Sequence, residues 1–485
     1  LRNHIARCRS YGPNKEIFSA NRQKILTFAG TKDKLEAIGF SQEEVTKACV
    51  EMIIIDEFPF TFVEGEGFRR FCMQACPMWR VPSRKTIAKD VLSLFYSEKD
   101  KLKSQLKTFR VCLTTDTWTS IQQTNYMVLT THFIDDDWML HKKILNFCVI
   151  PNHKGESIAQ LLEECLVEWG IEKVLTITVD NASANDSGLR DLVHRISGWG
   201  IPNALLHDGK YLHMRCVAHI LNLVVNDGIK LLNTAIQSIR NAVRYVRSSP
   251  QRLESFKRCV EKVRIESKGL VILDVPTRWN STFLMLESAL KFKMAFDRLK
   301  VDDGHYLPYF VKDNHDNMRE GPPSMDDWSE AGIFAIFLRP FYEVTLKVCC
   351  SNTPTVHTTF GDLFKIKSLL HENKDDELLS MISKLMQEKY DKYWGSLENM
   401  NQYLFIALVL DPRHKLEKVV DYFEIQFGED EEKVESATNG VKDLLIDLYK
   451  IHEDVYFGTQ QSINSGGSSQ TTSGDSSSSM TEIES

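Results

Sequence analysis

The pattern of apolar and polar positions predicts a helical region first and a mixed region of strands and helices after it. From Ile38 to about Leu106 the apolar residues recur with a helical period. The segment "SQEEVTKACVEMIIID" places Ser41 three residues before Glu44, which predicts a capping box at a helix start. Pro82 and Ser83 open a second segment of this kind, "PSRKTIAKDVLSLFYSEKDKLKSQL".

From Val111 the period changes to two or to continuous apolar runs, which predicts strands. Three such runs follow one another with polar turns between them: "VCLTTDTW", "NYMVLTTHFI" and "WMLHKKILNFCVI". Next come an amphipathic helix "GESIAQLLEECLVEWG", a buried strand "KVLTITVD", a helix "NASANDSGLRDLVHRI", a short strand "YLHMRC" and a helix "VAHILNLVVNDGIKLL".

The order β-β-β-α-β-α-β-α is that of the ribonuclease H-like fold. In such a mixed sheet, the crossover from the third strand to the fourth lays the fourth strand parallel beside the first. Asp116, in "LTTDTWTS", and Asp180, at the end of "KVLTITVD", are therefore expected to lie side by side near strand ends, where sites of α/β sheets gather.

Two neighbouring carboxylates repel each other unless a cation lies between them, and Mg²⁺ suits oxygen ligands of this kind. Metal ions held there could activate an attacking oxygen in phosphodiester displacement. The alternative is that Asp116 caps a strand end or pairs with a lysine, and that Asp180 starts a turn with Asn181. Spacing alone does not separate the two interpretations.

Three further pairs could carry chemistry. Cys216 and His219 open a helix on which His219 could donate to a phosphate, although a half-buried structural histidine is the commoner case. Arg278 and Trp279 precede a helix that Ser281 or Thr282 could cap; such a pair could hold a phosphate and stack on an unpaired base, or Trp279 could be a packing anchor. His4 and Cys8 have the spacing of two zinc ligands, but an upstream C-x2-C is absent.

The charges are distributed unevenly along the chain. The net charge of −7 over 485 residues argues against a uniformly basic surface, yet eleven Lys or Arg face three Asp or Glu between residues 67 and 110. Arg69, Arg70, Arg84 and Lys85 lie there and are candidate DNA contacts, or simply a solvated helix surface. Eleven cysteines without framework spacing favour a reducing compartment, and no apolar run reaches transmembrane length.

Four ordered blocks carry a resemblance: "LTTDTWTS", "TITVDNASAND", "RCVAHILNLVV" and "RWNSTFLML". They resemble the hAT superfamily of DNA transposases, most closely its plant sleeper-type relatives with BED zinc fingers. "FLRPFYEVTLKV" and "ALVLDPRHKL" resemble the family's later segment. The resemblance implies that Asp116 and Asp180 are two acids of a catalytic triad, that Cys216 and His219 lie near the scissile phosphate, and that Trp279 stacks on a flipped base. It also implies that His4 and Cys8 end a BED finger.

The resemblance and the patterns together predict an α/β protein: a ribonuclease H-like mixed sheet interrupted by a large helical insertion and preceded by a helical domain. The expected parts are a finger remnant (1–8), a partly basic helical region (9–110), the ribonuclease H-like core (111–282), the helical insertion (283–456) and a Ser-rich disordered tail (457–485).

The family's third acid, a glutamate beyond the insertion, has no counterpart among these residues, and the first two finger cysteines are also missing. We therefore expect a domesticated, nuclear DNA-binding regulator without catalysis of its own. The alternative is a fragment of an active Mg²⁺-dependent transposase. Zinc is expected only together with the missing cysteines, and a homodimer only through a carboxyl-terminal segment that is not among the residues given. No membrane association is expected.

Overall fold

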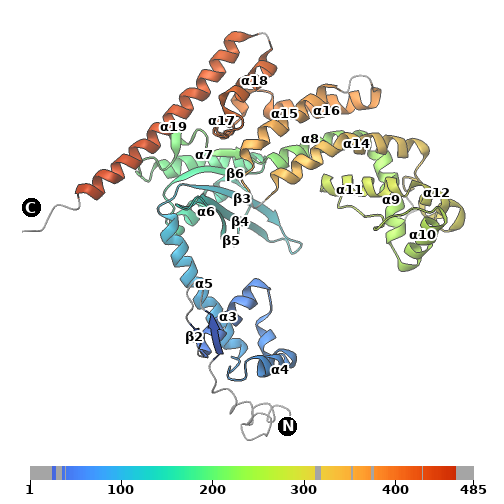
Figure 1. The fold of residues 1–485 in the computed structure, drawn as a ribbon. Helices are drawn as coiled ribbons and strands as arrows, with labels where there is room; N and C mark the ends of the chain where they lie inside the picture. Colours follow the sequence, from blue (N-terminus) through green and yellow to red (C-terminus); the bar gives the residue numbers. More distant parts are fainter. Residues whose placement is uncertain are drawn as a thin grey trace, which may run out of the picture. The chain divides into compact units, whose positions relative to one another are not determined.

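A computed structural model describes residues 25–28, 35–38, 40–311, 318–350, 353–372, 376–428 and 430–465, and its fold is drawn in Figure 1. Contacts divide the chain into two units, which are described separately. The first unit comprises Leu1–Phe109 with Trp169–Ile171, and the second comprises Arg110–Glu168 with Glu172–Ser485. Among the described helices, none is long and apolar enough to cross a membrane.

The first unit is built mainly from the predicted helices. They are α3 (Gln42–Ile55), the 3₁₀ helix η1 (Phe60–Glu64), α4 (Glu66–Ala75) and α5 (Arg84–Leu106). The Ser41 hydroxyl accepts a hydrogen bond from the Glu44 backbone N–H at 3.1 Å, so the Ser41 half of the predicted capping box is confirmed. Ser83 caps α5 in the same way, through the Thr86 N–H.

Two short strands stand in the region that we expected to be helical. They are β1 (Ile25–Phe28) and β2 (Leu35–Ile38), which pair antiparallel with Ile25 opposite Ile38. The prediction of helix for 9–110 is therefore wrong at these residues. Runs of four residues are too short to show a helical or a strand period, so the pattern of "ILTF" and "LEAI" carried no usable signal.

The second unit contains the predicted mixed sheet. Its strands are β3 (Val111–Thr119), β4 (Asn125–Ile134), β5 (Leu140–Val149), β6 (Val174–Val179) and β7 (His213–Arg215). The spatial order is β5-β4-β3-β6-β7, with β3 antiparallel to β4 and parallel to β6. The first and fourth strands of this sheet are thus neighbours, as predicted from the crossover rule.

Three helices alternate with these strands in the predicted order: α6 (Gly155–Trp169), α7 (Ser183–Ser197) and α8 (Val217–Leu231). The apolar stripe of α8 is buried as predicted at Ile220, Leu221, Val224 and Val225. The order of strands and helices confirms the expected ribonuclease H-like fold class.

Helices α6 and α7 approach each other closely at two glycines. A Cβ atom added to Gly188 would lie 2.9 Å from the carbonyl oxygen of Gly155 and 3.2 Å from its Cα, which is closer than packed atoms tolerate. We expect Gly188→Ala to lower the free energy of unfolding by about 1–3 kcal/mol, because the two helix backbones must move apart.

Chemical denaturation of the whole chain measures this effect. Gly440→Ala in α19 (Glu431–Ser465) is the matched control, since an added Cβ there meets nothing within 4 Å. It should leave stability unchanged or raise it slightly, because alanine favours a helix over glycine. Equal destabilisation by both substitutions would contradict a specific contact at Gly188.

All elements after β7 are helical in the described residues. They are α8, α9 (Asn233–Arg247), α10 (Pro250–Lys262), α11 (Trp279–Lys291), α12 (Lys293–Asp302), α13 (Pro308–Val311), α14 (Met325–Val348), α15 (Val356–Glu372), α16 (Glu377–Trp394), η3 (Leu397–Asn399), α17 (Tyr403–Val409), α18 (Lys415–Phe427) and α19. The boundary expected near residue 283 lies well inside this helical series. Helix α19 continues to Ser465, so residues 457–465 are not part of a structureless tail; residues 466–485 lie outside the described part.

A buried ion pair joins α9 to the loop that precedes α11. The Arg240 guanidinium donates to both carboxylate oxygens of Asp274, with Nη2 at 2.7 Å from Oδ2, and the Thr282 hydroxyl donates to the same oxygen at 2.7 Å. The Arg240 side chain is 5% exposed and that of Asp274 is 0% exposed. The pair fixes the loop because neither charge has access to water there.

The segment between α16 and α17 is bonded to the edge of the sheet. The Asn401 side-chain amide donates to the carbonyl oxygens of Tyr211 at 2.8 Å and His213 at 3.0 Å, and the Tyr211 hydroxyl donates to Gln402. His207 and Tyr403 are hydrogen-bonded at 3.0 Å. Residues from far along the chain thus form hydrogen bonds to the short strand β7 and to the segment just before it.

Candidate functional site

Asp116 and Asp180 are brought together by the register of two parallel strands. Thr114 of β3 lies beside Thr178 of β6, and continuing this register by two residues aligns Asp116 with Asp180 on one face of the sheet. The Asp116 carboxylate accepts a hydrogen bond from the Thr117 backbone N–H at 2.9 Å. The side-by-side arrangement predicted from the sequence therefore follows from the observed pairing.

Asp180 directly follows β6 and organises the turn into α7. One of its oxygens accepts hydrogen bonds from the Ala182 backbone N–H at 2.9 Å and from the Asn185 side-chain amide at 2.5 Å. Asp180 therefore starts the turn into α7, as the turn interpretation expected. Its carboxylate also lies next to Asp116, as the metal-site interpretation expected.

Cys216 and His219 continue the same row across the sheet. Val179 of β6 lies beside Arg215 of β7, so the next pair along is Asp180 and Cys216. The Cys216 backbone N–H donates to the Val179 carbonyl at 3.0 Å, and Cys216 then forms the N-cap of α8. His219 lies in the first turn of this helix. Asp116, which lies within β3, is therefore aligned with Asp180 and Cys216, which directly follow β6 and β7.

The electrostatics of this row reflect its crowding. Burial raises the pKa of Asp116, and the negative charge of Asp180 raises it further, whereas the Thr117 N–H and the charge of His219 act in the opposite direction. Burial also raises the pKa of the Cys216 thiol, with smaller contributions from Cys349 and Asp116. A positive charge placed at this row would relieve the repulsion between the carboxylates.

The residue types at this row match part of a magnesium site. Carboxylate oxygens are ligands that Mg²⁺ prefers, and Asp116 and Asp180 would supply two of them. In the described part of the chain, no group of three or more His, Cys, Asp and Glu side chains is arranged to hold a metal ion. The role of Mg²⁺ therefore remains a proposal.

Trp279 is buried in the core of the helical part, with 2% of its surface exposed. Helix α11 begins at this residue, and Arg278 is the N-cap without a side-chain capping bond. The predicted cap by Ser281 or Thr282 is wrong: the Ser281 hydroxyl bonds to Val275 and Arg278, and Thr282 bonds to Asp274. The packing interpretation of Trp279 is favoured, because a buried ring offers no face to a base. Arg278 is exposed and remains a candidate phosphate contact.

The four basic candidates of the first unit differ in their surroundings. Arg69 donates to the Val63 carbonyl at 3.1 Å, Arg70 lies 3.6 Å from Glu66, and Arg84 lies 4.0 Å from Glu64. Arg70, Arg84 and Lys85 are all exposed on α4 and the start of α5. Arg70 and Arg84 thus each have an acidic neighbour within 4.0 Å. His4 and Cys8 lie outside the described residues.

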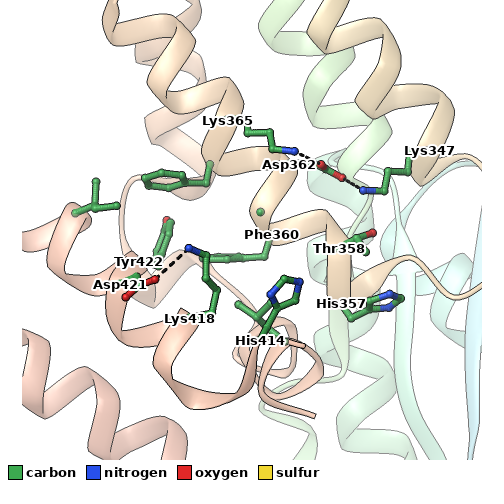
Figure 2. Close-up of a pocket in the computed structure, with 14 residues that line it drawn as sticks. Lys347, His357, Thr358, Phe360, Asp362, Lys365, His414, Lys418, Asp421 and Tyr422 are labelled. Carbon is green, nitrogen blue, oxygen red and sulfur yellow. Dashed lines mark hydrogen bonds and ion pairs between the residues drawn. The ribbon is translucent and has the colours of Figure 1, made fainter. Parts of the chain in front are cut away.

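A cavity of about 320 Å³ lies elsewhere in the helical part, between α14, α15, α17 and α18 (Figure 2). Its charged side chains are largely paired with one another: Lys347 and Lys365 contact Asp362 at 2.5 and 3.6 Å, and Lys418 contacts Asp421 at 3.1 Å. None of the residues lining this cavity belongs to the predicted site, so the cavity and the row of Asp116, Asp180 and Cys216 are separate features.

Three family models match successive parts of the chain. The ZBED1 RNase-like domain matches residues 114–211, the ZBED1 RNase-like helical domain matches residues 214–334, and the hAT-like transposase RNase-H fold matches residues 357–452. The first match contains Asp116 and Asp180, and the second begins just before Cys216. The matched parts between residues 114 and 452 are therefore hAT-like transposase domains.

The relatives of this chain carry names that agree with these family models. A putative AC transposase of Zea mays is 33% identical over 79% of this chain and 46% of its own length. The BED zinc-finger proteins RICESLEEPER 2 and RICESLEEPER 1 of Oryza sativa are each 31% identical, over 85% and 79% of this chain and 55% and 51% of their own lengths. The chain thus spans about half the length of these relatives. The resemblance to sleeper-type hAT proteins stated from the four blocks is confirmed.

Proposed function

We propose that this chain is a domesticated hAT transposase relative that acts in the nucleus as a DNA-binding regulatory protein and does not itself cleave DNA. The observation that carries the proposal is the incomplete acidic site: two carboxylates are aligned, and no third metal-ligating side chain is grouped with them in the described residues. The names of its relatives, which join transposases with BED zinc-finger proteins, support a DNA-directed role. Zinc would be bound by His4 and Cys8 only with upstream cysteines.

We attribute DNA binding to the basic helical region around Arg69, Arg70, Arg84 and Lys85 and, in a longer product, to the zinc finger. Exposed arginines and lysines attract DNA through its phosphates, and each contact releases counterions. We expect Arg70→Gln and Lys85→Gln each to reduce the slope of log affinity against log salt by about 0.9 on duplex DNA. Fluorescence anisotropy with a labelled duplex between about 50 and 200 mM salt measures this. An affinity that does not change with salt would contradict the assignment.

For a regulatory role, the carboxylates should be dispensable for binding. We expect Asp116→Asn and Asp180→Asn to leave DNA affinity unchanged or slightly higher, because each substitution removes a negative charge that repels phosphates. The same anisotropy assay measures this, and a strand-cleavage assay in Mg²⁺ runs beside it. Cleavage by the wild type that both variants lose would overturn the proposal.

That outcome would favour the second candidate, an active Mg²⁺-dependent transposase. The observation in its favour is the row of Asp116, Asp180 and Cys216 on three adjacent strands, with His219 in the first turn of the helix that follows. In this case Asp116 and Asp180 would hold the ion, which would supply Lewis-acid activation of the attacking oxygen. His219 would be placed to donate to a phosphate. A homodimer would form through a carboxyl-terminal segment of a longer product.

A further inference from the structure

A polar pocket of about 240 Å³ opens at the carboxyl ends of β6 and β7, within the second unit. It is lined by seven residues from three parts of the chain: Asn181, Ser183, Asp186, Arg215, Lys392, Tyr393 and Asn399. Asn181 immediately follows Asp180, and Arg215 immediately precedes Cys216. The pocket therefore lies at the same end of the sheet as Asp180 and Cys216.

Arg215 is held in a fixed orientation inside this pocket. One of its terminal nitrogens donates to the Asn181 side-chain oxygen at 3.2 Å, and the other lies 3.4 Å from the Asp186 carboxylate. The guanidinium carbon lies 6.0 Å from the centre of the Tyr393 ring. These contacts use two of the five N–H donors of the guanidinium, so the group is oriented while donors remain for a ligand.

Lys392 brings a second cation from helix α16. Its ammonium group lies 5.5 Å from the centre of the Tyr393 ring, and its side chain is exposed. The only carboxylate among the lining residues is Asp186, which already contacts Arg215 and His213. The lining residues therefore carry two cations against one carboxylate that is already in use.

The remaining lining residues include side chains that can donate hydrogen bonds. The Asn181 side-chain nitrogen is buried and has no hydrogen-bond partner among the described residues. The Ser183 hydroxyl lies in the first turn of α7, where the helix dipole favours negative charge. A buried amide donor without a partner costs free energy, which a ligand oxygen would recover. Two cations and several donors together suit an anion with many oxygens, that is, a phosphate group.

The geometry points to a phosphate-binding subsite in this pocket for the backbone of a nucleic-acid strand that passes the carboxylate row. Arg215 and Lys392 contact one phosphodiester, while the neighbouring stretch of the strand lies against Asp116 and Asp180. The inference rests on the proposed DNA binding and adds a location to it. Sequence reasoning missed both residues: Arg215 opens a quoted block in which only Cys216 and His219 were singled out, and Lys392 lies on a distant helix.

The test compares three glutamine variants of the whole chain on a labelled single strand of about 20 nucleotides. Lys392→Gln and Arg215→Gln should each weaken binding by about fivefold or more and reduce the salt slope by about 0.7. Lys384→Gln is the matched control, since Lys384 is exposed on the same helix α16 but does not line the pocket. It should change binding by less than about twofold. Circular dichroism checks that each variant is folded. If Arg215→Gln does not fold, Lys392→Gln still tests the proposal, because Lys392 is exposed and its substitution should not disturb the fold.

Binding of inorganic phosphate, followed by ³¹P line broadening, separates the two possible sources of the ligand. Loss of strand affinity in the pocket variants alone supports the subsite. If the variants lose phosphate binding but retain full strand affinity, the pocket takes a free phosphate and the strand assignment is overturned. Equal effects of Lys384→Gln and Lys392→Gln would also overturn it. A wild-type chain that binds the duplex but no single strand would overturn the subsite alone. One that binds neither would refute the proposed function itself, which is a distinct outcome.

Discussion

Asp274→Ala is expected to lower the free energy of unfolding of the helical part by about 3–5 kcal/mol, one of the largest effects available in this chain. The substitution leaves the Arg240 guanidinium buried without its carboxylate, since Arg240 is only 4% exposed and donates three hydrogen bonds to Asp274. Thr282 also loses its acceptor. Urea denaturation of the whole chain, followed by far-ultraviolet circular dichroism, measures the loss.

Lys257→Ala provides the control for this prediction. Lys257 pairs with Glu254 on the surface of α10 at 3.4 Å, and both side chains are well exposed. Such pairs contribute about 0–1 kcal/mol, so the control should barely shift the transition. If Asp274→Ala and Lys257→Ala had equal effects, the buried pair would not be holding the loop before α11.

The Arg240 and Asp274 pair also sets a direction for the effect of pH. Burial alone would raise the pKa of Asp274, but the hydrogen bonds from Arg240 and Thr282 outweigh it, and the pKa is lowered. A carboxyl group whose pKa is lower in the folded state stabilises the fold above its unfolded pKa and loses that contribution as the pH falls through the folded value. The difference in stability between wild type and Asp274→Ala should therefore shrink in acid.

Trp279→Ala should be comparably damaging, with a loss of about 3–5 kcal/mol, because a ring that is 2% exposed leaves a large cavity in the helical core. Trp138→Ala is the matched control, since Trp138 is 86% exposed in the turn between β4 and β5. It should change stability by no more than about 0.5 kcal/mol. The measurement is again urea denaturation of the whole chain.

The Trp279 experiment also tests the role implied by the family resemblance. A folded Trp279→Ala variant of unchanged stability that binds unpaired DNA more weakly would restore the base-stacking interpretation. The expected result is the opposite: Trp279→Ala lowers the free energy of unfolding, and this loss of stability is its primary effect. Phe at this position should retain most of the stability, because it refills much of the cavity.

Much of the sheet was predictable because its signals are local. The alternation in β3, β4 and β5 and the apolar stripe of α8 are each visible within about ten residues, and one crossover rule then places β6 beside β3. Asp116 and Asp180 met for the same reason: once two strands are parallel neighbours, their register decides which side chains share a face.

Other features of the fold and the site depend on contacts between residues that are far apart in the sequence, which no short stretch of sequence contains. An aromatic residue at a loop-helix junction has the same pattern whether it is buried or free, and only the helices packed around Trp279 decide between the two. Lys392 lies on a helix face that looks like any solvated face, and its position beside Arg215 depends on the fold of the intervening chain. The sequence pattern did not predict the strands β1 and β2 for a different reason: they are too short to show a period.

The hydrogen bonds of Asn401 to the edge of the sheet also bear on the timing of synthesis. The amide that ties down Tyr211 is 190 residues further along the chain, so it leaves the ribosome roughly 10–40 s after its acceptor at ordinary rates of elongation. During that interval the three-residue strand β7, which adjoins the carboxylate row, lacks part of its final support. The nascent sheet edge is thus exposed to aggregation and to chaperones until the helices have been made.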